Sequence, residues 1–173
     1  MSDFWVFGYG SLMWNPGFEP ADRHMATVHG FHRSLCVYSW VHRGTKESPG
    51  LVLGLDKGGS CRGVALKVPR KGADEIVAYL RERELVTDVY KEQQRPVKLD
   101  SGRRVEALVY VVDRNHEQYA GRLADEEIGR IVTGSQGRSG HNLEYVLNTV
   151  AHLRREGIFD PHLEAVADFL PRH

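Results

Sequence analysis

The segment best suited to chemistry is Gly8-Tyr9-Gly10-Ser11-Leu12, which directly follows the apolar run Phe4–Phe7. Glycine lets a backbone approach a ligand closely and adopt positive φ. A turn built on two glycines leaves backbone N–H groups without ladder partners, and such groups bind an anion or a developing oxyanion. The segment therefore predicts a loop that holds a small anionic group.

A carboxylate near the end of an expected helix is the second group suited to chemistry. The helix is predicted over Gly72–Leu85, and its apolar stripe at helical spacing consists of Ala73, Ile76, Val77 and Leu80. Glu84 follows Leu80 by one turn and falls on that stripe, whereas Glu82 falls on the opposite face. We therefore expect Glu84 to point inward and Glu82 to be solvated.

The inward carboxylate of Glu84 has a functional explanation and two structural ones. Burial raises the pKa of a carboxyl group, which makes a glutamate a useful base near neutral pH. A buried charge is costly unless it is paired, so an ion pair with Arg81, Arg83 or another arginine would also account for Glu84. The remaining explanation is that the helix ends early and Glu84 lies at a frayed terminus.

The elements that must position these groups are strands in the first two thirds of the chain and helices in the last third. The expected strands are Phe4–Phe7, Met25–His29, Ser34–Trp40, Leu51–Leu55, Arg62–Val68, Val86–Lys91, Arg95–Leu99 and Arg104–Val112. The later helices are expected over Ala124–Val132, Ser139–Glu156 and Pro161–Leu170, with Asp160 as the cap of the last. Tight turns are expected at Asp56–Gly59 and Asp100–Gly102. The pattern predicts a single α+β domain over residues 1–173, in which a small β-barrel carries flanking helices.

The composition argues against a nucleic-acid partner and a membrane partner. The 173 residues include 23 Lys plus Arg and 23 Asp plus Glu, whereas nucleic-acid binders usually show a basic excess. The local basic cluster is interpreted as a solvated strand face whose histidines are exposed or hydrogen-bonded rather than metal ligands; it comprises Arg23, His24, His29, His32 and Arg33. No apolar run is long enough to span a bilayer. Cys36 and Cys61 lie in apolar runs and predict buried free thiols, which indicates a cytoplasmic protein.

The region before the penultimate helix contains a second glycine-rich segment, Gly134–Gly140. It lacks the Gly-Lys-Ser/Thr ending of a phosphate-binding P-loop, so we interpret it as a turn with Ser139 as the N-cap of the helix. The expected core stripe of that helix is Leu143, Val146, Leu147, Val150 and Leu153. Tyr145 lies off the stripe and is a surface aromatic, a contact with a neighbouring element or part of a pocket rim.

Four segments of the chain together resemble the ChaC family of γ-glutamylcyclotransferases. The matching segments are Trp5–Trp14, Arg43-Gly44-Thr45 with Pro49-Gly50, Tyr79–Tyr90 with its Arg83-Glu84 pair, and Gly137–Tyr145 with the pattern Gly-x-Ser-Gly-x-Asn-x-Glu-Tyr. Their order and spacing agree with the family, and the resemblance covers nearly the whole chain.

The resemblance implies a compact barrel with flanking helices, no cofactor, and cleavage of glutathione into 5-oxoproline and cysteinylglycine. It implies that Glu84 is the general base, and that the substrate is bound by Val6, Phe7, Gly8, Tyr9, Gly10, Ser11, Leu12 and Tyr145. In such a reaction the substrate α-amine attacks its own γ-carbonyl and expels the dipeptide. One carboxylate can take the proton from the amine and give it to the leaving nitrogen.

Two other functions are open on the residues themselves. One is a cyclotransferase that acts on other γ-glutamyl peptides or amines, and the other is a non-catalytic domain that binds a small acid in the same pocket. A pure anion binder gains nothing from a buried carboxylate, so the inward position expected for Glu84 counts against the second function. The sequence does not indicate an oligomeric state.

Overall fold

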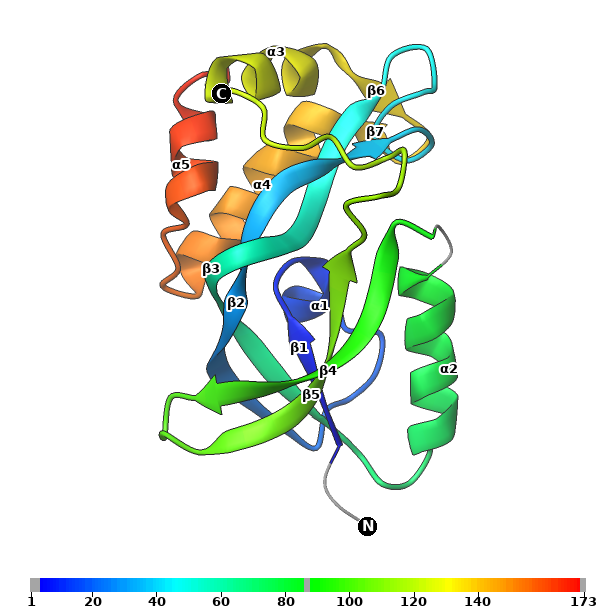
Figure 1. The fold of residues 1–173 in the computed structure, drawn as a ribbon, viewed down its shortest axis with the longest axis vertical. Coiled ribbons are helices and arrows are strands. Elements are labelled where there is room, and N and C mark those ends of the chain that lie inside the picture. Colours follow the sequence, from blue (N-terminus) through cyan, green and yellow to red (C-terminus); the bar gives the residue numbers. More distant parts are fainter. Residues whose placement is uncertain (1–3, 86–87, 172–173) are drawn as a thin grey trace. The chain divides into compact units, whose positions relative to one another are not determined.

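The computed structural model describes residues 4–85 and 88–171, in which strands precede most of the helices (Figure 1). The elements in chain order are β1 (Phe4–Gly8), α1 (Ser11–Trp14), β2 (Asp22–Ser39), β3 (Gly50–Val68), α2 (Ala73–Glu84), β4 (Tyr90–Leu99), β5 (Arg104–Val112), α3 (Asp125–Gly134), β6 (Gln136–Gly137), β7 (Gly140–His141), α4 (Asn142–Arg155) and α5 (Pro161–Ala167). Within the described residues β1 to β5 close a barrel in the order β1-β3-β2-β4-β5. The predicted α+β barrel with flanking helices is confirmed.

Strand β1 is apolar because neighbouring strands pair with both of its edges. It runs antiparallel to β3, with Gly8 opposite Val64, and parallel to β5, with Trp5 opposite Ala107. A strand with neighbours on both edges inside a closed barrel has little contact with water, and the side chains of Val6 and Phe7 are fully buried. The loop that follows β1 therefore starts from a rigid, central strand.

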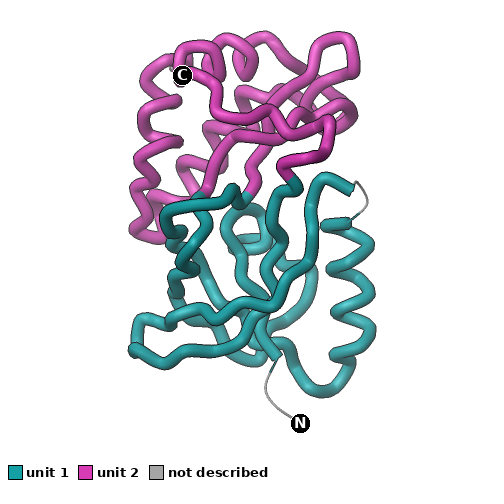
Figure 2. The backbone as a smooth tube through the Cα atoms, in the orientation of Figure 1, with its two compact units in different colours: residues 1–32, 55–113 teal, residues 33–54, 114–173 magenta. Residues whose placement is uncertain are grey.

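The chain divides into two compact units, which Figure 2 colours separately. The first comprises residues 1–32 and 55–113, and the second comprises residues 33–54 and 114–173. Strands β2 and β3 contribute residues to both units. The loop at residues 8–12 and Glu84 belong to the first unit, and Tyr145 belongs to the second. The single domain expected over residues 1–173 stays a prediction.

Two pairs of expected strands are each one continuous strand in the structure. The runs 25–29 and 34–39 lie in β2, which ends one residue before the expected Trp40, and the runs 51–55 and 62–68 lie in β3. The turn predicted at residues 56–59 is wrong, because these residues lie inside β3. Gly58 and Gly59 have φ of 106° and 71° there. Glycine adopts positive φ without steric cost, so this pair bends the backbone without ending the strand.

The β4–β5 hairpin confirms the turn predicted at residues 100–102. Gly102 has φ of 93°, and the Leu99 N–H donates to the Arg103 carbonyl oxygen at 2.8 Å. Lys98 then pairs with Arg104 in an antiparallel register. The expected strand 86–91 is described from residue 88 onward, and β4 begins at Tyr90; its residues 86 and 87 lie outside the described part.

The starts of α2 and α5 agree with the sequence to within one residue, whereas α4 starts later than expected and α5 ends at Ala167 rather than at Leu170. Helix α2 spans Ala73–Glu84, as expected, and Asp160 caps α5 by accepting from the Leu163 N–H at 3.0 Å. The prediction of Ser139 as an N-cap is wrong, because the β6–β7 hairpin occupies residues 136–141 and α4 begins at Asn142. The Ser139 hydroxyl instead hydrogen-bonds to Nδ1 of His42 at 2.8 Å.

The burial of Arg33 contradicts the expectation that the whole basic cluster is a solvated strand face. Arg33 is not part of a solvated face: its side chain is 1% exposed and pairs with Asp160 at 3.0 Å. The expectation was wrong because strand alternation assigns a face only after the partner elements are known. His24 matches the hydrogen-bonded alternative, with Nε2 2.8 Å from Asp22 Oδ2.

Cys36 and Cys61 are both free and buried, as predicted. In residues 4–85 and 88–171, no helix has the length and apolar character needed to cross a membrane.

Candidate active site

Helix α2 packs its apolar stripe onto the barrel and thereby draws Glu84 inward. The buried cluster beneath it consists of Val6, Leu12, Val68, Leu80, Leu108 and Tyr110, with Ile76 and Leu85 packed against its edge. Glu84 follows the fully buried Leu80 by one turn, and its side chain is 18% exposed. Glu82 is exposed. The helical spacing therefore identified the inward carboxylate of this helix correctly.

The environment of Glu84 combines burial with one nearby positive charge. Burial raises the pKa of the Glu84 carboxyl group, and Arg83 opposes the rise with the smaller effect. Arg83 Nε lies 3.4 Å from Glu84 Oε1, so the ion pair considered as an alternative is present. Glu84 is also the last residue of α2, where the Leu85 N–H closes the final turn on the Arg81 carbonyl oxygen at 2.8 Å. A partly desolvated carboxylate with a raised pKa is suited to proton transfer near neutral pH.

The loop after β1 turns at once into the short helix α1. Gly10 is its N-cap residue, and the Gly10 carbonyl oxygen accepts from the Met13 N–H at 2.9 Å. Gly8 and Tyr9 are buried, Gly10 is half-buried and Ser11 is exposed. Of the residues in this segment that are predicted to bind substrate, Gly10 and Ser11 are thus the accessible ones.

The other residues predicted from this segment face inward. The side chains of Val6, Phe7 and Leu12 lie in the core. Because these side chains are buried, Val6 and Phe7 present no side-chain atoms to a ligand. Their side chains instead fix the strand from which the loop emerges.

Gly63 of β3 lies against Gly8, where this loop begins. The sequence analysis did not identify it as a residue of the site. A Cβ atom at Gly63 would overlap the Gly8 carbonyl oxygen and would lie 2.8 Å from Phe7 Cζ. A glycine inside a strand pattern often marks a close backbone approach, so its position in the run 62–68 was the available signal. The loop is positioned by β3 as well as by β1.

Arg83 connects the end of α2 to the segment that follows the loop. Its Nη2 donates to Ser11 Oγ at 2.9 Å, and its Nη1 donates to the Asn15 carbonyl oxygen at 2.7 Å. Nη1 also lies 3.2 Å from the Tyr79 hydroxyl. The sequence indicated Arg83 as a possible partner of Glu84, but it did not indicate these contacts with residues about seventy positions away.

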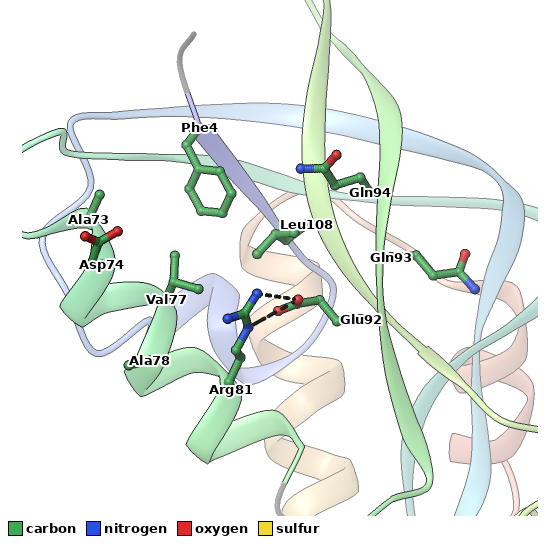
Figure 3. Close-up of a pocket in the computed structure, with 10 residues that line it drawn as sticks. All are labelled: Phe4, Ala73, Asp74, Val77, Ala78, Arg81, Glu92, Gln93, Gln94 and Leu108. Atoms are coloured by element: carbon green, nitrogen blue, oxygen red, sulfur yellow. Dashed lines mark hydrogen bonds and ion pairs between the residues drawn. The ribbon is translucent and has the colours of Figure 1, made fainter. Parts of the chain in front are cut away.

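A pocket of about 690 Å³ is lined by residues of α2 and of the barrel strands β1, β4 and β5, and Figure 3 shows its lining. The lining residues are Phe4, Ala73, Asp74, Val77, Ala78, Arg81, Glu92, Gln93, Gln94 and Leu108. Neither Glu84 nor the loop at residues 8–12 belongs to this set. The side chains of Arg81 and Glu92 meet in the pocket, with Nη2 and Oε2 3.0 Å apart.

Tyr110 joins this ion pair to the core beneath α2. Its hydroxyl donates to Glu92 Oε1 at 3.0 Å. Burial and the negative charges of Glu92 and Glu84 raise the pKa of Tyr110 well above its usual range. Tyr110 therefore stays neutral and remains a hydrogen-bond donor at physiological pH.

The second unit brings the two remaining motif segments together. The Asn142 side chain bonds to the backbone of Leu51, and a Cβ atom at Gly50 would overlap the Arg43 carbonyl oxygen. At Gly44, a Cβ atom would overlap the Gly50 nitrogen. Gly44 and Gly50 are therefore required by close backbone packing.

Tyr145 contacts a neighbouring element, which was one of the three alternatives for it. Its hydroxyl oxygen accepts from the Leu53 N–H at 3.1 Å, and the Arg43 guanidinium lies 5.4 Å from its ring centroid. The predicted stripe of α4 is correct for Val146, Val150 and Leu153, whereas the buried face is completed by Asn142 and Thr149, with Leu143 and Leu147 only half-buried.

Comparison with known proteins agrees with this arrangement. The family model described as ChaC-like protein matches residues 4–172. The chain belongs to the ChaC-like family. A relative from Escherichia coli, named glutathione-specific gamma-glutamylcyclotransferase, is 34% identical over 159 residues, which are 92% of this chain and 69% of the relative. A ChaC-like relative from Mus musculus, glutathione-specific gamma-glutamylcyclotransferase 1, is 35% identical over 170 residues, covering 95% of this chain and 76% of its own length.

The crystal structure of a γ-glutamyl cyclotransferase specific to glutathione from yeast has the same fold as this ChaC-like chain. It superposes with a TM-score of 0.84 at 25% identity and covers 100% of this chain and 99% of its own. The resemblance inferred from the four segments is therefore confirmed at the level of family and fold.

Proposed function

We propose that this chain is a γ-glutamylcyclotransferase that converts glutathione into 5-oxoproline and cysteinylglycine. The observation that carries the proposal is the pairing, within one unit, of a carboxylate with a raised pKa and a glycine-rich turn. Arg83 contacts both Glu84 and Ser11. The names of the relatives from Escherichia coli and Mus musculus support glutathione as the substrate.

Glu84 acts as general base and then as general acid in this proposal. Its carboxylate accepts a proton from the substrate α-amine, whose nitrogen then forms a bond to the γ-carbonyl carbon. The bond from that carbon to the cysteine nitrogen breaks, and Glu84 returns the proton to the leaving amine. Burial raises the pKa of Glu84, which brings it closer to the operating pH and favours both transfers.

Amine and carbonyl belong to one molecule, so part of their proximity is supplied by the substrate itself. The site has to hold the substrate folded back, with the two reacting atoms close together and aligned. Backbone N–H groups at Gly10 and Ser11, which are the accessible part of the loop, bind the developing oxyanion or the substrate α-carboxylate. One oxyanion donor is worth about 2.7–4 kcal/mol. In this proposal the binding site takes its shape from Val6, Phe7, Gly8, Tyr9 and Leu12.

Tyr145 is the substrate-binding residue that we assign to the second unit. Its ring and hydroxyl lie on the first turn of α4, next to Leu53 of β3. We further propose that residues 1–173 work as one domain, since β2 and β3 are continuous between the two units. The two buried free thiols support a cytoplasmic location.

The deciding experiment measures 5-oxoproline after purified protein is incubated with glutathione at millimolar concentration. Glu84→Gln is expected to lose turnover while remaining folded, and Glu82→Gln, on the same helix but exposed, is expected to keep it. Full turnover in both variants would show that Glu84 is not the base. A folded wild-type protein that binds glutathione without releasing 5-oxoproline would favour the binding domain, and faster turnover of γ-glutamyl-alanine would favour the broader cyclotransferase.

A further inference from the structure

Arg83 contacts three separate groups of the candidate site from one guanidinium group, two at the ends of α1 and one on its own helix α2. Nε faces the Glu84 carboxylate at 3.4 Å, Nη2 donates to Ser11 Oγ at 2.9 Å, and Nη1 donates to the Asn15 carbonyl oxygen at 2.7 Å. The Arg83 side chain is 20% exposed. Arg81, one half-turn earlier, is 57% exposed and pairs with Glu92 instead.

The chemistry of the guanidinium explains why an arginine suits this position. It is planar, carries its donors in a fixed fork and stays charged throughout the accessible pH range. The three nitrogens can therefore address three acceptors whose mutual directions are fixed. A lysine ammonium supplies the same charge, but it is a point charge on a flexible stem and lacks the fork.

A second contact joins the same two segments. Tyr79, one turn before Arg83, lies 3.2 Å from Arg83 Nη1 through its hydroxyl. A Cβ atom at Gly17 would overlap that hydroxyl and the Tyr79 ring. The segment from Ser11 to Gly17 thus meets α2 at Tyr79 as well as at Arg83, which makes the relation between them specific.

We propose that Arg83 is a positioning residue for the reaction, which holds the turn at Ser11 and the Glu84 carboxylate in a fixed relation to each other. This inference rests on the proposed function of Glu84 and the loop. Proton transfer and carbonyl attack must occur on one small substrate, so base and turn have to keep their separation. A misplacement of about 1 Å can cost a factor of 10² in rate.

The charge of Arg83 has an additional effect on Glu84. Arg83 lowers the pKa of Glu84 while burial raises it. Removing the positive charge leaves burial unopposed, so the pKa of Glu84 rises further. The ionised base then becomes populated at a higher pH, which moves the acidic limb of the rate profile upward.

The test compares Arg83→Met, Arg83→Lys and the control Arg81→Met. For Arg83→Met we expect kcat to fall by about 10²-fold with little change in KM, and the acidic limb of the kcat profile to move to higher pH. Arg83→Lys retains the charge, so its limb stays near that of wild type while its kcat remains low. Arg81→Met is expected to keep wild-type kcat and pH profile, because Arg81 pairs with Glu92 on the exposed side of the helix and not with Glu84.

Two results would overturn the role of Arg83. The first is a wild-type kcat and pH profile in Arg83→Met. The second is a parallel loss of kcat and thermal stability in Arg83→Met and Arg81→Met without movement of the acidic limb, which would show that Arg83 only supports the fold.

A titration of the Glu84 carboxyl carbon by NMR, without substrate, separates this proposal from the proposed function. A higher Glu84 pKa in Arg83→Met supports the coupling whether or not glutathione is the substrate, and an unchanged pKa contradicts it. Failure of the wild-type protein to release 5-oxoproline would overturn the proposed function by itself.

Discussion

Asn142 and Leu51 exchange two hydrogen bonds, as two paired strand residues do. The Leu51 N–H donates to Asn142 Oδ1 at 2.8 Å, and Asn142 Nδ2 donates to the Leu51 carbonyl oxygen at 2.8 Å. Asn142 is fully buried. The amide side chain thus continues the ladder of β3 at the first residue of α4, and this asparagine of the Gly-x-Ser-Gly-x-Asn-x-Glu-Tyr segment is structural.

Replacing Asn142 with alanine should therefore destabilise the protein strongly. The change deprives two buried backbone groups of their partners, and each unsatisfied group costs about 1–3 kcal/mol. We expect a loss of at least about 2 kcal/mol in the free energy of unfolding, measured by urea denaturation. Asn148→Ala is the matched control, since Asn148 is exposed on the same helix. Similar losses for both variants would contradict the ladder role of Asn142.

The Glu84→Gln variant should be more stable than wild type at neutral and alkaline pH. Because burial raises the pKa of Glu84, the folded state keeps the proton to a higher pH than the unfolded state does. Wild-type stability therefore falls as the pH rises from about 4.5 through the folded pKa. Glutamine removes this penalty, and relief of such a functional cost is commonly worth about 0.5–2 kcal/mol.

Thermal melts at pH 4 and pH 8 test the pH dependence of this gain. The advantage of Glu84→Gln over Glu82→Gln should be present at pH 8 and small at pH 4, where Glu84 is mostly protonated in both states. A Glu84→Gln protein that is less stable than Glu82→Gln at pH 8 would show that attraction by Arg83 outweighs burial.

Replacing Gly63 with alanine should disturb the loop that follows β1. Its Cβ atom would overlap the Gly8 carbonyl oxygen, and overpacking of this kind costs about 1–3 kcal/mol. We expect Gly63→Ala to lower both the melting temperature and the rate of 5-oxoproline release. Gly134→Ala is the control, because a Cβ atom there meets nothing within 4 Å. A fully active Gly63→Ala protein would mean that the loop shifts without consequence.

Loss of the Asp160 carboxylate should destabilise the second unit. Asp160 caps α5 and pairs with Arg33, whose side chain is 1% exposed. Removing the partner of a buried charge is strongly destabilising, so Asp160→Ala should cost about 3 kcal/mol or more. Asp100→Ala breaks the pair with Arg62 in which both side chains are exposed, and solvent screening makes its effect much smaller. Chemical denaturation of the two variants checks the difference.

Local sequence patterns were sufficient to predict the structure where the geometry depends only on residues within one element. The period of the helix was enough to separate Glu84 from Glu82, and the Asp160-Pro161 pair marked the start of α5. The same patterns failed at Ser139, where a short hairpin intervenes, and at Gly58-Gly59, where positive φ occurs inside a strand. Glycine signals that the backbone can turn, and pairing with neighbouring strands decides whether it does.

The sequence by itself determined the family, through the resemblance carried by its four motif segments. It also determined the order of the main elements and the inward carboxylate, because helical and strand periodicities are properties of neighbouring residues. The tertiary structure alone decided that Arg83 bonds to Ser11 and Asn15, that Gly63 supports Gly8, and that Asn142 pairs with Leu51. Each of these contacts joins segments far apart in the chain. They exist because the closed barrel and the packing of helices on it bring those segments together, and no local spacing encodes that closure.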